Sequence, residues 1–191
     1  IPDFHTIMDL ASHLGTHVEC PYHHNDSWTD VQGLPISTFM GRAIYVDITH
    51  MEANGKIMAE DLEKACGDRI RENDIVILDS PYKIPPFTPL TNTPEDKRLV
   101  IGRETALWLK EKKVKCVGFG DGVSIESNNT DVSAFHDVLM EVNVVFLEVL
   151  QNLEELSTDT FFMSYAPIPI KGLDSCPIRA YAIEGLGEFS K

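Results

Sequence analysis

The side chains best able to bind a metal ion cluster in one short run near the N-terminus. Three histidines and one glutamate stand there on odd-numbered positions: His13, His17, Glu19 and His23. Residues two apart share a face in an extended segment, so this spacing predicts that the imidazoles and the carboxylate point the same way. Imidazole nitrogens and carboxylate oxygens bind first-row divalent cations. We therefore predict a metal site on this run.

The local composition favours an extended conformation over a helix. His13 and His17 are four residues apart, which also suits a helical metal motif, but Gly15 and Pro21 are poor residues for a helix interior. In a straight strand the Cα atoms of His13 and His17 would lie roughly 13 Å apart, too far for easy sharing of one ion. We therefore predict a bend at Gly15 and an end to the extended segment near Pro21.

Composition limits the classes of protein and partner. A chain of 191 residues with 43% hydrophobic and 24% charged residues predicts one domain over residues 1–191. A net charge of −14 disfavours nucleic acids and anionic membranes as partners. The four cysteines form no CxxC pair, which favours reduced thiols and a cytoplasmic location. The chain starts at Ile1, so a preceding segment remains an open alternative.

Hydrophobic periodicity predicts strands that alternate with helices, which is typical of an α/β domain. Residues 81–94 contain five prolines and are predicted to be a loop at the rim of a site. The predicted strands are 43–48, 74–79, 114–119, 144–147, 161–165 and 178–183, and the predicted helices are 59–66, 104–112 and 134–142.

Two residues outside the N-terminal run could complete a metal site. His136 lies on the predicted helix 134–142, and Glu148 follows the predicted strand 144–147. Adjacent elements could bring both side chains to one place, although spacing alone argues this only weakly. His5, His24 and His50 are interpreted as core or surface residues, and Cys20 as a core residue on the opposite strand face.

The run from His13 to His23 closely resembles HxGTHxDxPxH, the signature of the cyclase-like metal-dependent hydrolases, which include bacterial kynurenine formamidases and isatin hydrolases. Six positions match, and Glu19 replaces the usual aspartate. The resemblance covers most of the chain and includes the apolar strand 74–78, the VGFGD segment, His136, FLEVLQNLEEL with Glu148, and PIPIKGLDSCPIRAYAI.

This resemblance implies a role for each matching residue. His13, His17 and Glu19 match ligands of a first metal ion, while His136 and Glu148 match residues that complete a second site. His23 matches a histidine that moves protons. The implied cofactor is Zn²⁺ or Mn²⁺, with one or two ions per chain. The implied activity is hydrolysis of an amide C–N bond in a small aryl formamide or cyclic amide by metal-activated water.

The resemblance also implies a single α/β domain of the swivelling β/β/α type, with a mixed, partly barrel-like sheet flanked by helices, and a homo-oligomer, either a dimer or a tetramer. Two departures keep alternatives open: Glu19, and Asp79-Ser80 in place of the usual Thr-Gly. The alternatives are a lactone- or imide-opening or cyclising enzyme of the same family, and a metal-binding protein without catalysis.

Overall fold

The most apolar segments of the chain form the centre of an eight-stranded sheet in the computed structural model, which describes residues 3–85, 88–125 and 130–187. Side chains of the central strand β3 alternate between two hydrophobic clusters: Val76 and Leu78 face one, and Ile75 and Ile77 face the other. A strand buried on both faces has a continuous apolar sequence, which explains why this strand was predictable. Four neighbouring strands run parallel: β2 (Met40–Asp47), β3 (Ile75–Asp79), β5 (Cys116–Gly120) and β7 (Val145–Leu150).

Antiparallel strands extend this parallel centre at both edges, in the order β10-β8-β2-β3-β5-β7-β1-β9. The added strands are β1 (His17–Glu19), β8 (Thr160–Ser164), β9 (Ser175–Pro177) and β10 (Tyr181–Ile183). A flat sheet of this size would separate its edges by about 34 Å. However, β9 and β10 lie on opposite edges and are joined by residues 178–180 alone, which span at most ~15 Å. The sheet must therefore curl, and the predicted mixed, partly barrel-like sheet is confirmed.

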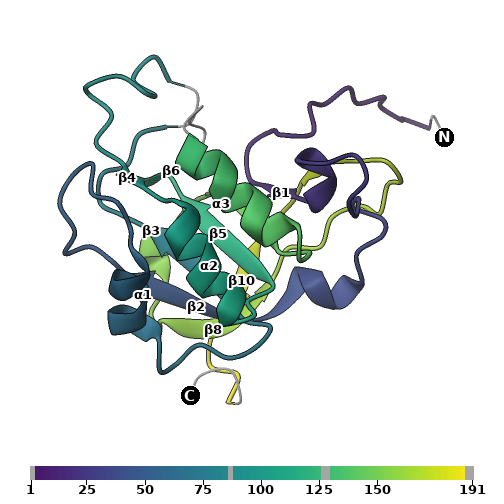
Figure 1. Ribbon diagram of the computed structural model, residues 1–191. Helices are drawn as coiled ribbons and strands as arrows, with labels where there is room; N and C mark the ends of the chain where they lie inside the picture. The colour runs from purple at the N-terminus through teal and green to yellow at the C-terminus, as the bar shows by residue number, and fades with distance from the viewer. Residues whose placement is uncertain (1–2, 86–87, 126–129, 188–191) are drawn as a thin grey trace.

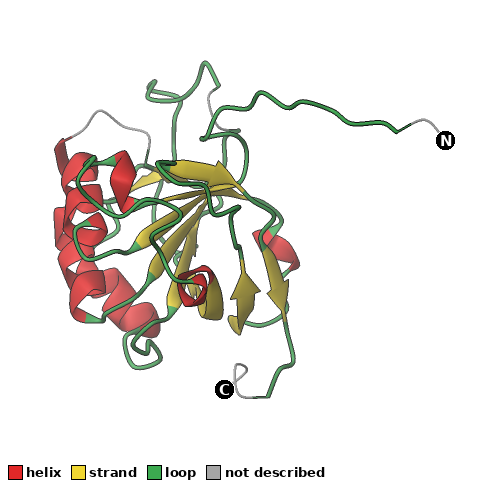
Figure 2. Ribbon diagram, turned by 90° about the vertical axis from the view of Figure 1, so that its right-hand side faces the viewer, coloured by secondary structure: helices red, strands yellow, loops and turns green. Residues whose placement is uncertain are grey.

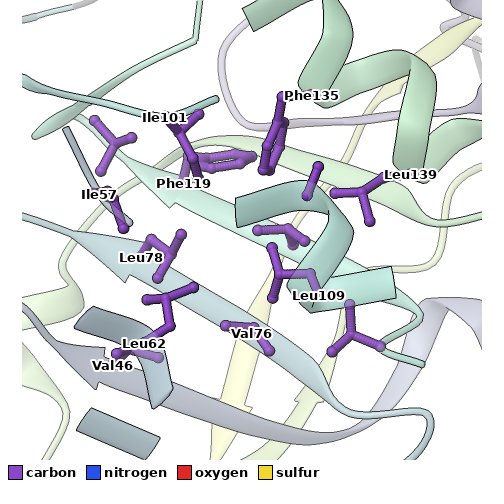
Figure 3. Packing of buried hydrophobic residues seen from close by; sticks show 14 of the residues in the cluster. Val46, Ile57, Leu62, Val76, Leu78, Ile101, Leu109, Phe119, Phe135 and Leu139 are labelled. Atoms are coloured by element: carbon purple, nitrogen blue, oxygen red, sulfur yellow. The ribbon is translucent and has the colours of Figure 1, made fainter. Parts of the chain in front are cut away.

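Three helices cover one face of the sheet: α1 (Ala59–Cys66), α2 (Arg103–Glu111) and α3 (Thr130–Met140). Figure 2 shows them together on one side of the strands. Leu62, Leu109 and Phe135 pack from the three helices onto Val76 and Phe119 of the sheet (Figure 3). The other face carries a second cluster, to which no residue of the three helices belongs. The predicted α/β class is confirmed, with its helices on one face.

Element boundaries differ from prediction where pairing between distant segments decides them. The helix predicted over 134–142 spans Thr130–Met140 instead, and its first turn buries Val132. Of the extended segment predicted over 178–183, only Tyr181–Ile183 is a strand, β10, which pairs with β8. The strand β9, which pairs with β1 on the opposite edge of the sheet, was not predicted. The structure also contains the short strands β4 (Leu99–Val100) and β6 (Val123–Ser124), and 3₁₀ turns at Pro21–His23, Ile36–Phe39 and Leu153–Glu155.

Two segments extend from this domain. Residues 3–11 form an exposed arm that projects away from the body in both views (Figures 1 and 2). The predicted proline-rich loop has no helix or strand over 81–85 and 88–94, and residues 86–87 of the prediction lie outside the described residues. Among the described residues, no helix has the length and apolar character needed to cross a membrane.

Candidate metal centre

Strand pairing brings the N-terminal run against the strand that carries Glu148. β1 pairs antiparallel with β7, and the register places His17 directly opposite Glu148. Directly opposed residues project from the same face of a sheet, so their side chains meet. His17 Nε2 lies 3.5 Å from Glu148 Oε2. Only β1 is a strand within the predicted extended run, and it ends just before the 3₁₀ turn that begins at Pro21.

The chain bends where the sequence predicted, at Gly15. Its φ of +59° lies in the left-handed region, which glycine adopts without cost. The bend returns His13 to the site, and the His13 and His17 ring centroids are 5.0 Å apart. Thr16 fixes the bend to the sheet because its Oγ1 donates a 2.7 Å hydrogen bond to the carbonyl oxygen of Val149. Gly15 and Thr16 therefore shape the site without entering it.

Glu19 lies at the centre of the site and presents its two oxygens to different partners. Oε1 lies 3.0 Å from His13 Nδ1 and 3.6 Å from His23 Nε2, while Oε2 faces His136 Nε2 at 3.9 Å. Two groups of three possible ligands share this carboxylate: His13, His17 and Glu19, and Glu19, His136 and Glu148. Within each group the ligand atoms lie within 4.8 Å of one another. The two groups therefore meet at the carboxylate of Glu19.

The helix α3 supplies His136 from above the sheet. Its Nδ1 donates a 2.7 Å hydrogen bond to the carbonyl oxygen of Val132, one turn earlier, and its ring packs against Phe146. His24 also reaches this place: it stacks on His136 with ring centroids 4.7 Å apart and an interplanar angle of 7°. Its Nδ1 lies 2.9 Å from Asp137 Oδ1. His24 therefore lies beside the site, although it belongs to neither of the two ligand groups that share Glu19.

Unpartnered buried atoms show that these residues fit a cation. His17 Nε2 and Glu19 Oε2 are buried and have no hydrogen-bond partner among the described residues. His17 Nδ1 must carry a proton, because the atom facing it at 2.8 Å is the carbonyl oxygen of Gly15. His136 Nδ1 must carry a proton for the same reason, because it faces the carbonyl oxygen of Val132. Both Nε2 atoms therefore present lone pairs to carboxylate oxygens, an arrangement that a divalent cation stabilises.

Burial and mutual hydrogen bonding shift the pKa values in the site. Burial lowers the pKa of both His17 and His136, which keeps these imidazoles neutral and able to bind metal. The hydrogen bond with Glu19 is the main cause that raises the pKa of His13 to about 8. Burial alone would raise the pKa of Glu19, but the hydrogen bond from His13 and the nearby imidazoles lower it. Glu19 is therefore an anion at neutral pH.

His23 and Asp174 form the exposed rim of the site. His23 lies in the 3₁₀ turn after β1, and about a third of its side chain is exposed. Asp174 lies directly before β9 and contacts both His13 and His23. Burial opposes ionisation of Asp174, but hydrogen bonds from these two imidazoles lower its pKa to about 2. Asp174 belongs to the segment PIPIKGLDSCPIRAYAI, but only the pairing of β9 with β1 brings it to the site.

The structure gathers all six predicted site residues in one place: His13, His17, Glu19, His23, His136 and Glu148. Cys20 is fully buried among apolar side chains, as predicted. His50 is exposed, as is His5 on the N-terminal arm, so neither contributes to the cluster. Asp79 also lies outside the cluster: one of its oxygens accepts backbone hydrogen bonds from Ser80 and Gly122, and the other pairs with Lys83.

The curled sheet and its buried cluster of histidines and carboxylates place this chain among α/β proteins with a candidate metal site. The chain belongs to the family described as "Putative cyclase", whose model matches residues 2–127. The family predicted from the N-terminal run is therefore confirmed.

Relatives and solved structures agree with this assignment. The chain is 23% identical to the kynurenine formamidase of Bacillus thuringiensis (strain Al Hakam) over 173 residues, which cover 91% of this chain and 77% of that protein. The fold is similar to that of an isatin hydrolase bound to the product analogue thioisatinate, with a TM-score of 0.77, 18% identity, and coverage of 91% and 72% of the two chains. A potential metal-dependent hydrolase with cyclase activity gives a TM-score of 0.74, 23% identity, and coverage of 91% and 80%.

Proposed function

We propose that this chain is a metal-dependent hydrolase that cleaves the amide C–N bond of a small aryl formamide or cyclic amide. The observation that carries the proposal is the pair of buried, unpartnered atoms, His17 Nε2 and Glu19 Oε2, within a cluster of nitrogen and oxygen ligands. The relatives support the amide class, because a kynurenine formamidase and an isatin hydrolase are among them.

The ligand set favours Zn²⁺ or Mn²⁺ as the cofactor, and the two groups that share Glu19 favour two ions per chain. His13, His17 and Glu19 would hold one ion, and Glu19, His136 and Glu148 the other. When bound, such a cation supplies a Lewis acid, which makes water nucleophilic at neutral pH and polarises a carbonyl group.

His23 is positioned to move the proton. Its Nε2 faces Glu19 at 3.6 Å, and its ring is exposed enough to meet a substrate that enters from solvent. A neutral imidazole at this place can accept a proton from the attacking water and deliver it to the departing nitrogen. Without that delivery the amide nitrogen would leave as an anion, which is a poor leaving group.

We also propose a homo-oligomer in the cytoplasm. The exposed arm carries large apolar side chains, Phe4 and Ile7 at 93% exposure and Met8 at 73%, and a second copy of the chain could cover them. The cysteines of the described residues are free, which fits a reducing compartment. In this proposal residues 1–191 act as one domain.

The experiment is an assay of the full chain, loaded with Zn²⁺ or with Mn²⁺, on a panel of N-formyl aromatic amines and aromatic cyclic amides. We expect release of formate or of a ring-opened acid, and loss of turnover after chelation. His17→Ala should lower bound metal, measured by elemental analysis, together with activity. Normal metal content in this variant would overturn the ligand assignment, and tight metal binding without turnover on any substrate would overturn the catalytic proposal.

A further inference from the structure

One carboxylate outside the two ligand groups contacts two histidines of the site at the same time. Asp174 Oδ2 lies 2.8 Å from His13 Nε2 and 3.2 Å from His23 Nδ1. The next residue, Ser175, is paired with Glu19, and the carbonyl oxygen of Asp174 accepts a 2.9 Å hydrogen bond from the backbone N–H of Cys20. The strand pair β1–β9 therefore fixes the place of this carboxylate relative to the site.

These contacts decide which ring nitrogens carry protons. An ionised carboxylate only accepts hydrogen bonds, so the nitrogens that face Asp174 must donate. His13 then carries a proton on Nε2, and His23 carries one on Nδ1. The opposite nitrogens, His13 Nδ1 and His23 Nε2, are the two that face Glu19, at 3.0 and 3.6 Å. The carboxylate thus turns the remaining nitrogen of each ring toward the site.

We propose that Asp174 is a positioning residue, which holds His23 as the Nδ1–H tautomer so that Nε2 faces the reacting groups, and which orients His13 for metal binding through Nδ1. This inference rests on the proposed function of His23 as the proton-transferring group. A buried aspartate sets the tautomer of the catalytic histidine in serine proteases by the same chemistry.

An alternative role for Asp174 is that of a metal ligand. The side chains of His13, His23 and Asp174 are also close enough to surround an ion, with ligand atoms within 4.8 Å of one another. However, a neutral imidazole offers one lone pair, and His13 Nδ1 is the nitrogen that faces Glu19, at 3.0 Å. Its Nε2 is then a donor, which fits a hydrogen bond to Asp174 better than a third ion.

The test compares Asp174→Asn with Asp159→Asn, an exposed carboxylate that pairs with Arg69 on the surface and serves as the matched control. The asparagine can turn its amide N–H toward His23, which permits the wrong tautomer. At saturating Zn²⁺ we expect kcat to fall about 10- to 100-fold. KM should change little, and metal stoichiometry should match that of the wild type and of the control. Asp174→Glu, which restores the carboxylate, should recover part of the lost kcat.

A second readout does not depend on activity. Nitrogen-15 NMR of the imidazoles should show the Nδ1–H tautomer of His23 in the zinc-loaded wild type and a mixture of tautomers in Asp174→Asn. Loss of one equivalent of zinc in Asp174→Asn would show that Asp174 is a ligand and overturn the proposal. An unchanged tautomer together with unchanged kcat would also overturn it. If the wild type turned over no substrate, the NMR result would still decide the role of Asp174. Failure of the proposal for Asp174 is therefore distinguishable from failure of the proposed function.

Discussion

A glutamate rather than an aspartate lies at the centre of this site, and its length affects the two ligand groups differently. Glu19 reaches from β1 toward His13 with one oxygen and toward His136 on α3 with the other. His136 is the more distant partner, at 3.9 Å against 3.0 Å for His13. The ligand group of Glu19, His136 and Glu148 therefore depends more strongly on the additional methylene of the Glu19 side chain.

This dependence predicts different metal contents for two substitutions. Glu19→Asp retracts the carboxylate by about 1.5 Å, so we expect bound zinc to fall from two equivalents toward one, with the group of His136 and Glu148 emptied first. Glu19→Gln keeps the length but removes the charge, so both ions should bind more weakly. Elemental analysis after equilibrium dialysis measures both effects. Glu63→Gln, which changes an exposed carboxylate on α1, is the control, and two equivalents in Glu19→Gln would argue against a shared carboxylate.

Most of the site residues that the sequence predicted lie close together in the chain, whereas the contacts of the others depend on how distant elements pack. His13, His17, Glu19 and His23 stand in one short run, so they are close along the chain. The strand β1 places His17 and Glu19 on one face, and the bend at Gly15 and the 3₁₀ turn bring His13 and His23 to the same place. His24 and Asp174 were not predicted to belong to the site, because neither follows the odd-numbered spacing of the N-terminal run. The stacking of His24 depends on where α3 crosses the sheet, and the contacts of Asp174 depend on the pairing of β9 with β1.

At the scale of elements, the bend at Gly15 is the feature on which the site depends most directly. A straight strand would carry His13 away from His17, whereas the left-handed residue returns it. A Cβ atom built on Gly15 would meet nothing within 4 Å, so a substitution there costs backbone strain rather than steric overlap. A substitution at Gly15 therefore measures the cost of the left-handed backbone conformation without an added steric clash.

We expect Gly15→Ala to lower the free energy of unfolding by about 1–2 kcal/mol, the cost of the left-handed conformation for a residue with a Cβ atom. Gly15→Asn should lose less, since asparagine adopts this conformation more readily. Urea denaturation of the wild type and both variants, at equal metal concentration, gives the comparison. Equal stability of the alanine variant and the wild type would mean that the bend is not left-handed in solution.

Helices and strands that depend on a local sequence pattern were predicted well, whereas strands that depend on pairing between distant segments were not. α1 begins and ends as predicted, because its amphipathic pattern is local. β3 and β5 were predictable because strands buried on both faces are continuously apolar. The strand β9 was not predicted, and β10 is shorter than the predicted strand 178–183, since both are decided by pairings on opposite edges of the curled sheet.

At the scale of the whole molecule, that curl connects folding, metal binding and protonation. It brings β9 beside β1, so that Asp174, His13 and Glu19 form a chain of hydrogen bonds across strands that are far apart in the sequence. Without a metal ion, a protonated His13 can donate to both carboxylates. This interaction stabilises the metal-free fold below pH 6.5, and the stabilisation is lost as the pH rises through about 8, the raised pKa of His13.

Metal binding should therefore release close to one proton per chain near pH 6.5. His17 and His136 contribute less than His13, because burial lowers their pKa, whereas His13 must give up the proton on Nδ1 to bind an ion. Calorimetric titration in buffers of different ionisation enthalpy counts the protons. At constant free Zn²⁺, the metal-induced rise in Tm should increase from pH 6.0 to pH 7.5. A rise in Tm independent of pH over this range, or a release of three protons, would mean that His13 is not the group that competes with the metal.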